Sequence, residues 1–234
     1  MLEPFMHQWL AASDVNAEIS NGYAQKGQAY GIDFNAPYVA VVIENNQVEL
    51  PDYRFAFDLD HLRRVYIVQE ENVEKLLLTM PAHVLAGVGQ PHKSLKETVT
   101  EGIFALALTS SLVDSMQVVY YKDISSLAVV VQTGLVFPET EQLLQRKVDE
   151  EVQLTLWLYG TYGHSMSDLS EALHVHRRTI QYRLDKIMQL TGFNPRVPAD
   201  NVPLLVSYMR LRTTQIVPAL VARLERFSQV GALN

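Results

Sequence analysis

The segment from Ser165 to Gly192 constrains the fold of this chain more than any other. Its sequence, SMSDLSEALHVHRRTIQYRLDKIMQLTG, predicts two short helices joined by a tight turn. The second helix carries basic and polar side chains in its first two turns, and its other face is an apolar stripe of Ile180, Leu184, Ile187 and Met188. This layout is typical of a helix-turn-helix, whose second helix enters the major groove of DNA.

The caps and the turn of this motif have candidate residues of the right type. Ser165 is the predicted N-cap of the first helix, with Asp168 completing a capping box. His174 falls in the turn, where a positive φ is usual; Gly is commonest there, but His is tolerated. His176 is the candidate N-cap of the second helix.

The candidate DNA-binding residues lie on the second helix and are Arg177, Arg178, Thr179, Gln181, Tyr182, Arg183 and Lys186. Arginine pairs with phosphates or gives two hydrogen bonds to guanine, and glutamine reads adenine in the same way. Threonine and tyrosine contact a thymine methyl group or a phosphate. We therefore predict operator recognition by helix 176–190; the alternative is an ordinary amphipathic helical hairpin with solvated arginines.

Charge is distributed unevenly along the 234 residues, whose formal net charge is −7. From Arg177 to the C-terminus there are nine Lys and Arg against three Asp and Glu, whereas the first 176 residues hold ten against 23. This split predicts an acidic body with a basic binding module, although solvated helix faces would also produce it. The absence of cysteine, of a membrane-length apolar run and of a signal-peptide pattern predicts a cytoplasmic protein with no membrane partner.

The first half of the chain mixes strand and helix patterns. A helix is predicted from residue 4 to about 30, ended by Gly31. Further helices are predicted at 70–80 and 94–113, the second capped by Ser94, and strands at 37–44, 53–57, 62–68, 83–89 and 116–121. Their order predicts an α+β protein that begins with a ferredoxin-like α/β sandwich, with an added hairpin whose tip is at 58–61.

The second half contains helical patterns only. Residues 123–134 are predicted to be a short apolar connection, and residues 138–159 one or two helices broken near Asp149. We therefore predict a regulatory or dimerisation domain at 1–134 and an all-α DNA-binding domain at 135–234. The C-terminal run places Leu220 and Leu224 at helical spacing, which fits either a helix packed on its own domain or a dimer-forming helix.

The run LHVHRRTIQYRLDKIMQLTGFNP resembles the C-terminal DNA-binding domain of PucR/CdaR-type transcriptional regulators. Its signature is V-H-x-x-T-(I/L)-x-Y-R-L, followed by a tail similar to I-x-x-(I/L)-T-G-x-(N/D)-P. The matching positions are Val175, His176, Thr179, Ile180, Tyr182, Arg183, Leu184, Ile187, Leu190, Thr191, Gly192 and Asn194. The resemblance covers residues 150 to 212 and implies a regulator that binds operator DNA.

The first half is similar to the GGDEF-like domain that precedes this module in CdaR-type regulators. The features that carry this likeness are Gly31-Ile32-Asp33, Gly87-Val88-Gly89 and the run from Val119 to Ile124. The predicted hairpin tip, Asp58-Leu59-Asp60-His61, lacks the Gly-Gly and the paired acids with which a nucleotide cyclase holds metal and triphosphate. The resemblance therefore implies a degenerate domain without cyclase activity.

Other patterns indicate no catalytic or metal centre. His174 and His176 do not share a helical face, and Gly87-Val88-Gly89 lacks the lysine and hydroxyl residue of a phosphate loop, which favours a close-packed strand end. Asp58 and Asp60 suit a cation, but acids at a hairpin tip are more often solvated turn residues. No nucleophile lies in a recognisable elbow. We predict a protein that is not an enzyme and uses no cofactor or metal.

The sequence thus predicts a transcriptional regulator that binds double-stranded DNA as a homodimer, under the control of a small-molecule effector or partner. The family likeness implies sugar acids or purine-derived metabolites as effectors. The alternative is a ligand- or nucleotide-binding signalling module with vestigial DNA binding, and salt-sensitive DNA binding separates the two.

Overall fold

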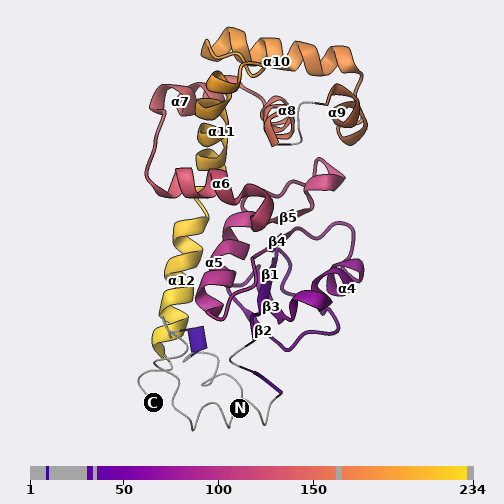
Figure 1. The fold of residues 1–234 in the computed structure, drawn as a ribbon, viewed down its shortest axis with the longest axis vertical. Helices are drawn as coiled ribbons and strands as arrows, with labels where there is room; N and C mark the ends of the chain where they lie inside the picture. Colours follow the sequence, from indigo (N-terminus) through magenta and orange to yellow (C-terminus); the bar gives the residue numbers. More distant parts are fainter. Residues whose placement is uncertain (1–8, 11–30, 34–35, 162–164, 231–234) are drawn as a thin grey trace. The chain divides into compact units, whose positions relative to one another are not determined.

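The computed structural model describes residues 9–10, 31–33, 36–161 and 165–230 (Figure 1). Contacts divide the chain into unit 1 (Met1–Ser111, Gln117–Lys122 and Ile216–Asn234) and unit 2 (Leu112–Met116 and Asp123–Gln215). These units are not the predicted domains 1–134 and 135–234, because the C-terminal helix packs with the first half of the chain. The predicted helix at 4–30 lies outside the described residues, apart from residues 9 and 10.

Unit 1 is built on a five-stranded sheet with the strand order β2-β3-β1-β4-β5. Its strands are β1 (Val39–Ile43), β2 (Phe55–Asp58), β3 (Arg64–Val68), β4 (Ala86–Val88) and β5 (Val118–Tyr120). The β4–β5 pair is parallel and the other neighbouring pairs are antiparallel. Each strand falls at a predicted position, and the mixed α/β character of this half is confirmed. The ferredoxin-like topology stays a prediction.

Both faces of the sheet are covered (Figure 1). Ala40 and Val42 of β1 belong to a core shared with α5 (Leu95–Leu106) and α12 (Val217–Val230). The alternate residues of β1 belong to a second core with α4 (Val73–Leu78), which follows the 3₁₀ turn η1 (Glu70–Asn72). Burial on both faces explains why residues 37–44 show no apolar–polar alternation.

The helix α5 approaches β4 so closely that only glycine fits between them. A Cβ atom at Gly87 would lie 2.1 Å from the carbonyl oxygen of Gly102, and one at Gly89 would lie 2.2 Å from that of Thr98. The close-packed strand end predicted at Gly87-Val88-Gly89 is therefore confirmed. Ser94 caps α5 by accepting a hydrogen bond from the Glu97 N–H at 3.4 Å, but the helix ends at Leu106, earlier than predicted.

The helix α12 packs on α5 and contributes Leu220 and Leu224 to the core of unit 1. An ion pair of 3.2 Å between Lys96 of α5 and Glu225 of α12 joins the two helices at the surface. The C-terminal helix is thus a structural part of unit 1, although the sequence predicts it in the second domain. None of the helices in the described ranges has the length and apolar character of a membrane span.

Unit 2 is helical and begins with the 3₁₀ turn η2 (Asp114–Met116). The predicted connection at 123–134 is wrong, because residues 123–132 belong to α6 (Tyr121–Gln132), whose Ile124, Ala128 and Val131 form a buried face. The break predicted near Asp149 is confirmed by the boundary between α7 (Pro138–Lys147) and α8 (Glu150–Thr161). The remaining helices are α9 (Met166–Ala172), α10 (Arg177–Thr191) and α11 (Pro198–Thr213).

Candidate nucleic-acid interface

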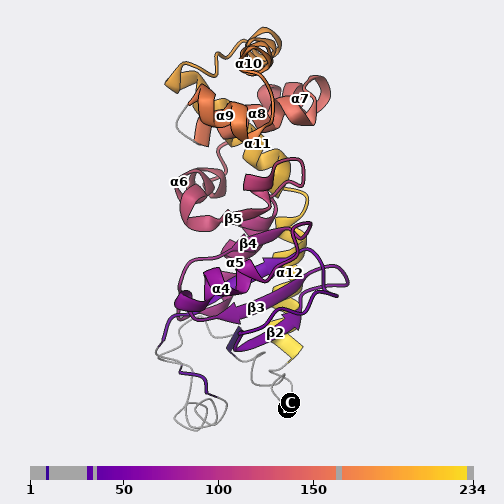
Figure 2. The ribbon, with the colours of Figure 1, turned by 90° about the vertical axis from the view of Figure 1, so that its right-hand side faces the viewer.

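The helices α9 and α10 form a two-helix motif packed on α8 (Figure 2). Ser165 caps α9, with its Oγ accepting a hydrogen bond from the Asp168 N–H at 3.3 Å. His174, in the turn, has a φ of 50°, which is the left-handed conformation that the motif requires. His176 caps α10 by accepting a hydrogen bond from the Arg178 N–H at Nδ1, at 3.2 Å. The backbone therefore turns sharply between two capped helices.

A small hydroxyl residue and a buried stripe hold the two helices together. The Ser170 hydroxyl donates to the carbonyl oxygen of Val175 at 2.7 Å. This hydrogen bond joins the two ends of the turn. Ile180, Leu184 and Ile187 of α10 are fully buried, and Leu169 of α9 is 2% exposed. This burial fixes the rotation of α10 about its axis, so the residues on its opposite face are turned outward.

The outward face of α10 carries four residues that we term the outer strip: Arg178, Gln181, Tyr182 and Asp185. They follow the i, i+3, i+4, i+7 spacing of a single helical face. Arg178 and Gln181 are exposed, and Tyr182 is 67% exposed, which is unusual for an aromatic side chain. Exposed arginine, glutamine and tyrosine on one face are the side-chain types that hydrogen-bond base edges and phosphates.

Two other predicted contact residues flank the outer strip. Arg177 is exposed, and its Nη2 donates to the Ser167 hydroxyl at 3.0 Å, which directs it along the N-terminal end of α9. Thr179 is half-buried on the other side of the strip. Both residues lie in the first turn of α10, the end that enters the groove in this motif.

Arg183 instead contacts α8, and Lys186 contacts Asp149, the residue that precedes α8. Arg183 donates from Nη1 to the Thr155 hydroxyl at 3.1 Å and forms an ion pair with Glu151 through Nη2. The Lys186 Nζ lies 2.6 Å from a carboxylate oxygen of Asp149, and this hydrogen bond lowers the pKa of Asp149 and raises that of Lys186. The structure therefore separates the predicted contact residues into an outward group and a group paired with acids of the same unit.

Asp185 and Arg196 are charged residues of this surface that the sequence does not single out. Asp185 belongs to the outer strip through the same periodicity as Gln181 and Tyr182, and that periodicity is a signal available in the sequence. Arg196 follows α10 in the chain, and its Nη1 donates to Asp185 at 2.8 Å. Only the fold brings this loop residue to the face of the helix.

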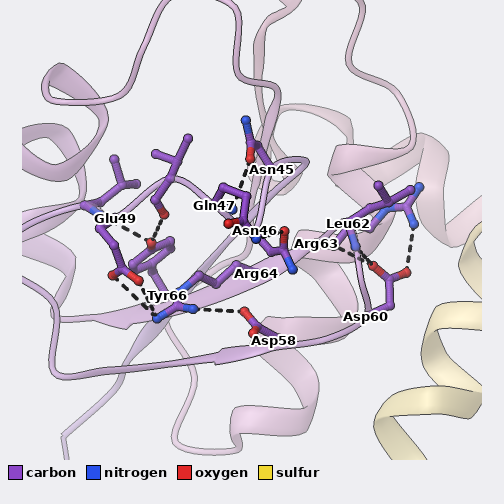
Figure 3. Close-up of polar contacts among 12 residues, drawn as sticks. Asn45, Asn46, Gln47, Glu49, Asp58, Asp60, Leu62, Arg63, Arg64 and Tyr66 are labelled. Atoms are coloured by element: carbon purple, nitrogen blue, oxygen red, sulfur yellow. Dashed lines mark hydrogen bonds and ion pairs between the residues drawn. The ribbon is translucent and has the colours of Figure 1, made fainter.

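The hairpin tip between β2 and β3 is occupied by internal ion pairs (Figure 3). Asp60 accepts hydrogen bonds from the N–H groups of Leu62 and Arg63 at 2.8 Å, and its other oxygen pairs with the Arg63 guanidinium at 2.9 Å. Burial opposes its ionised form, but these bonds lower its pKa overall. Asp58 pairs with Arg64 at 3.0 Å. Asp60 is therefore a buried structural residue, where the sequence favours a solvated one.

Groups of His, Asp or Glu that could hold a metal ion do not occur among the described residues.

A positive-φ turn between capped helices, a buried stripe and an outward polar face together define the helix-turn-helix class. Residues 153–209 match the family model of the PucR C-terminal helix-turn-helix domain. Residues 153–209 are thus similar to a PucR-type helix-turn-helix domain, and this similarity points to a transcriptional regulator that binds DNA.

Among solved structures, the chain is similar to a regulator of polyketide synthase expression from Bifidobacterium adolescentis, with 13% sequence identity and a TM-score of 0.33. This alignment covers 90% of the present chain and 93% of the other. A comparison with curated proteins finds no match.

Proposed function

We propose that this protein regulates transcription by binding operator DNA through α10, with the outer strip directed at base edges. The observation that carries the proposal is the exposure of Arg178, Gln181 and Tyr182 on one face of a helix whose opposite face is buried. In an ordinary helical hairpin, nothing would cover a tyrosine ring that is two-thirds exposed. On a helix that faces DNA, the bound DNA would cover this ring.

Each residue of the proposed surface has a role that follows from its place. Arg178 and Gln181 are the base-reading residues, since each offers two groups that hydrogen-bond a purine edge. Tyr182 contacts a thymine methyl group or a phosphate. Arg177 and Thr179, at the flanks, are phosphate contacts that set the position of the helix. Arg183 and Lys186 support the interface by fixing α10 on α8.

We also propose that the protein acts as a homodimer and that unit 1 is a GGDEF-like regulatory domain. Two recognition helices in a dimer meet successive turns of the groove, so the half-sites should lie about 34 Å apart or at multiples of that spacing. An effector would then act by changing the relative placement of the two helices. The ion pairs of Asp58 and Asp60 support a regulatory domain without cyclase chemistry.

A cavity in unit 1 supports effector control. Its volume is about 360 Å³, within the range of small-molecule sites, and it lies at the carboxyl ends of the parallel strands β4 and β5. Val39, Val73 and Val88 give it apolar walls. Glu70, Glu74 and Lys122 also line it, and Glu74 accepts a hydrogen bond from the Tyr120 hydroxyl at 2.7 Å. This cavity also favours the second candidate function, a ligand-binding module whose DNA binding is vestigial.

A salt titration with the purified full chain separates these two functions. The probe is a fluorescent duplex of random sequence, and its affinity is measured from low to physiological salt. A regulator that contacts several phosphates should bind it with an affinity that falls steeply and linearly on a double-logarithmic plot, by about 0.9 in slope per contact. Absence of binding at low salt would contradict the proposed function. The ligand-binding module would then be the remaining candidate function.

A further inference from the structure

The strongest unexplained feature of unit 2 is the position of Arg196 on the outer strip. Its Nη1 donates to Asp185 at 2.8 Å and its Nη2 to the backbone carbonyl oxygen of Gln181 at 3.3 Å. The guanidinium is thus attached at two points, both on the outward side of α10. These bonds use two of its five N–H groups, so three donors are left for a ligand.

The loop that carries Arg196 is itself fixed. The Arg196 N–H donates to the side-chain oxygen of Asn194 at 3.1 Å, and the Asn194 N–H donates to Asp200 of α11 at 3.0 Å. A further hydrogen bond, from the Val197 N–H to the Asn194 carbonyl oxygen at 2.9 Å, completes the turn. The side chain therefore starts from a constrained backbone, which reduces the conformational entropy lost on binding.

The charge of Asp185 requires an explanation on a DNA-facing strip. A carboxylate beside the phosphate backbone is repelled by it, and Asp185 retains 48% side-chain exposure. Arg196, with 34% side-chain exposure, neutralises this carboxylate with a guanidinium that does not come from α10. A bare acid would oppose DNA binding, whereas the pair offers guanidinium donors at the same place.

From this geometry we propose that Arg196 is a further DNA-binding residue, which binds a backbone phosphate while it is held in position by Asp185 and Gln181. The inference rests on the proposed function of α10 as the recognition helix. It makes the loop after α10 a second contact with the DNA backbone and gives Asp185 a positioning role.

The test measures the salt dependence of duplex binding for the full chain and its Arg196→Gln variant. Loss of one phosphate contact should reduce the double-logarithmic slope by about 0.9 and lower the affinity about five- to tenfold at 0.1 M salt, on both selected and random duplexes. Arg223→Gln, which removes an exposed arginine of α12, is the charge-matched control and should leave the slope unchanged. An unchanged slope in Arg196→Gln, with wild-type binding intact, overturns this inference but not the proposed function; absence of wild-type binding overturns both.

Two more variants separate phosphate binding from a merely structural role. Arg196→Lys keeps the charge but loses the two-point attachment, so it should retain the wild-type slope with a moderate loss of affinity. Asp185→Asn removes the repulsive charge but keeps a side-chain oxygen that can accept the Arg196 hydrogen bond, so it should raise the affinity at least twofold. If Asp185→Asn instead weakened binding to a selected duplex alone, Asp185 would be reading a base, and the positioning role would be refuted. Thermal unfolding of each variant verifies that it is folded.

Discussion

The guanidinium of Arg183 lies 3.1 Å from the hydroxyl of Thr155 and thereby joins α10 to α8. Arg183 is only 11% exposed, whereas Arg178 on the same helix is exposed. Five residues correspond to about 140° of rotation around a helix, which separates the two arginines onto different faces. Arginines that look equivalent in the sequence therefore have different predicted functions, one structural and one in DNA recognition.

Replacing Arg183 with alanine should reduce stability more than it alters phosphate contacts. The variant loses bonds to Thr155 and Glu151, so we expect the free energy of unfolding to fall by about 1 kcal/mol in urea denaturation. The salt slope of duplex binding should stay at the wild-type value. Arg178→Ala is the matched control and should change stability by less than about 0.5 kcal/mol. A shallower slope in Arg183→Ala at unchanged stability would show that Arg183 binds phosphate after all.

The positive φ of His174 predicts a specific response to substitution. His174→Gly relieves the strain of the left-handed conformation and should leave stability unchanged or slightly raised. His174→Val places a β-branched side chain in that conformation and should cost about 1–2 kcal/mol, measured by urea denaturation. The control is His83→Val, at an exposed position outside the positive-φ residues of the described chain. Equal effects of valine at both positions would contradict the role of the turn.

Asp60 should contribute stability that depends on pH. Its pKa is lower in the folded chain than in the unfolded chain, so the contribution is present above the unfolded value and is lost as pH falls through the folded value. In urea denaturation, the stability of the wild type should decline below about pH 4. Asp60→Asn should be less stable by about 1–2 kcal/mol at pH 7, and this deficit should shrink at pH 3.

The control for Asp60 is Asp58→Asn, because Asp58 also pairs with an arginine but keeps 51% side-chain exposure. We expect a loss below about 0.5 kcal/mol at pH 7 for this exposed pair. If the deficit of Asp60→Asn did not depend on pH, ionisation of this carboxyl group would not be the source of its stabilising effect.

The sequence predicts well those features that depend on local interactions. Caps, a turn residue and an apolar stripe within 28 residues predict α9 and α10, because each feature involves residues close in the chain. The strands of unit 1 are also predictable from local sequence, because short runs rich in β-branched residues predict strands. The connection predicted at 123–134 is wrong because the β-branched residues of this run obscure the helical spacing of Ile124, Ala128 and Val131.

Features that depend on tertiary contacts could not be predicted from the sequence. The helix α12 shows an apolar stripe in the sequence, but only the fold reveals that Leu220 and Leu224 are buried against α5. The same limit applies to Arg183, since its acidic partner Glu151 is 32 residues away. Arg196 is likewise recognisable as part of the surface only when the loop after α10 is seen beside Asp185.

The most direct test of the central claim is a comparison of operator and random DNA for a variant of the outer strip. Sequences bound by the full chain are first selected from a random duplex library, where a dimer should yield a palindromic consensus. The affinities of Gln181→Ala and Arg178→Ala are then measured on the consensus and on a random duplex, with Gln145→Ala as an exposed control on α7.

We predict that each strip variant loses about 1–3 kcal/mol on the consensus, with little change on random DNA and none in the control. Selection without a consensus, or equal losses on both duplexes, would contradict base reading by α10.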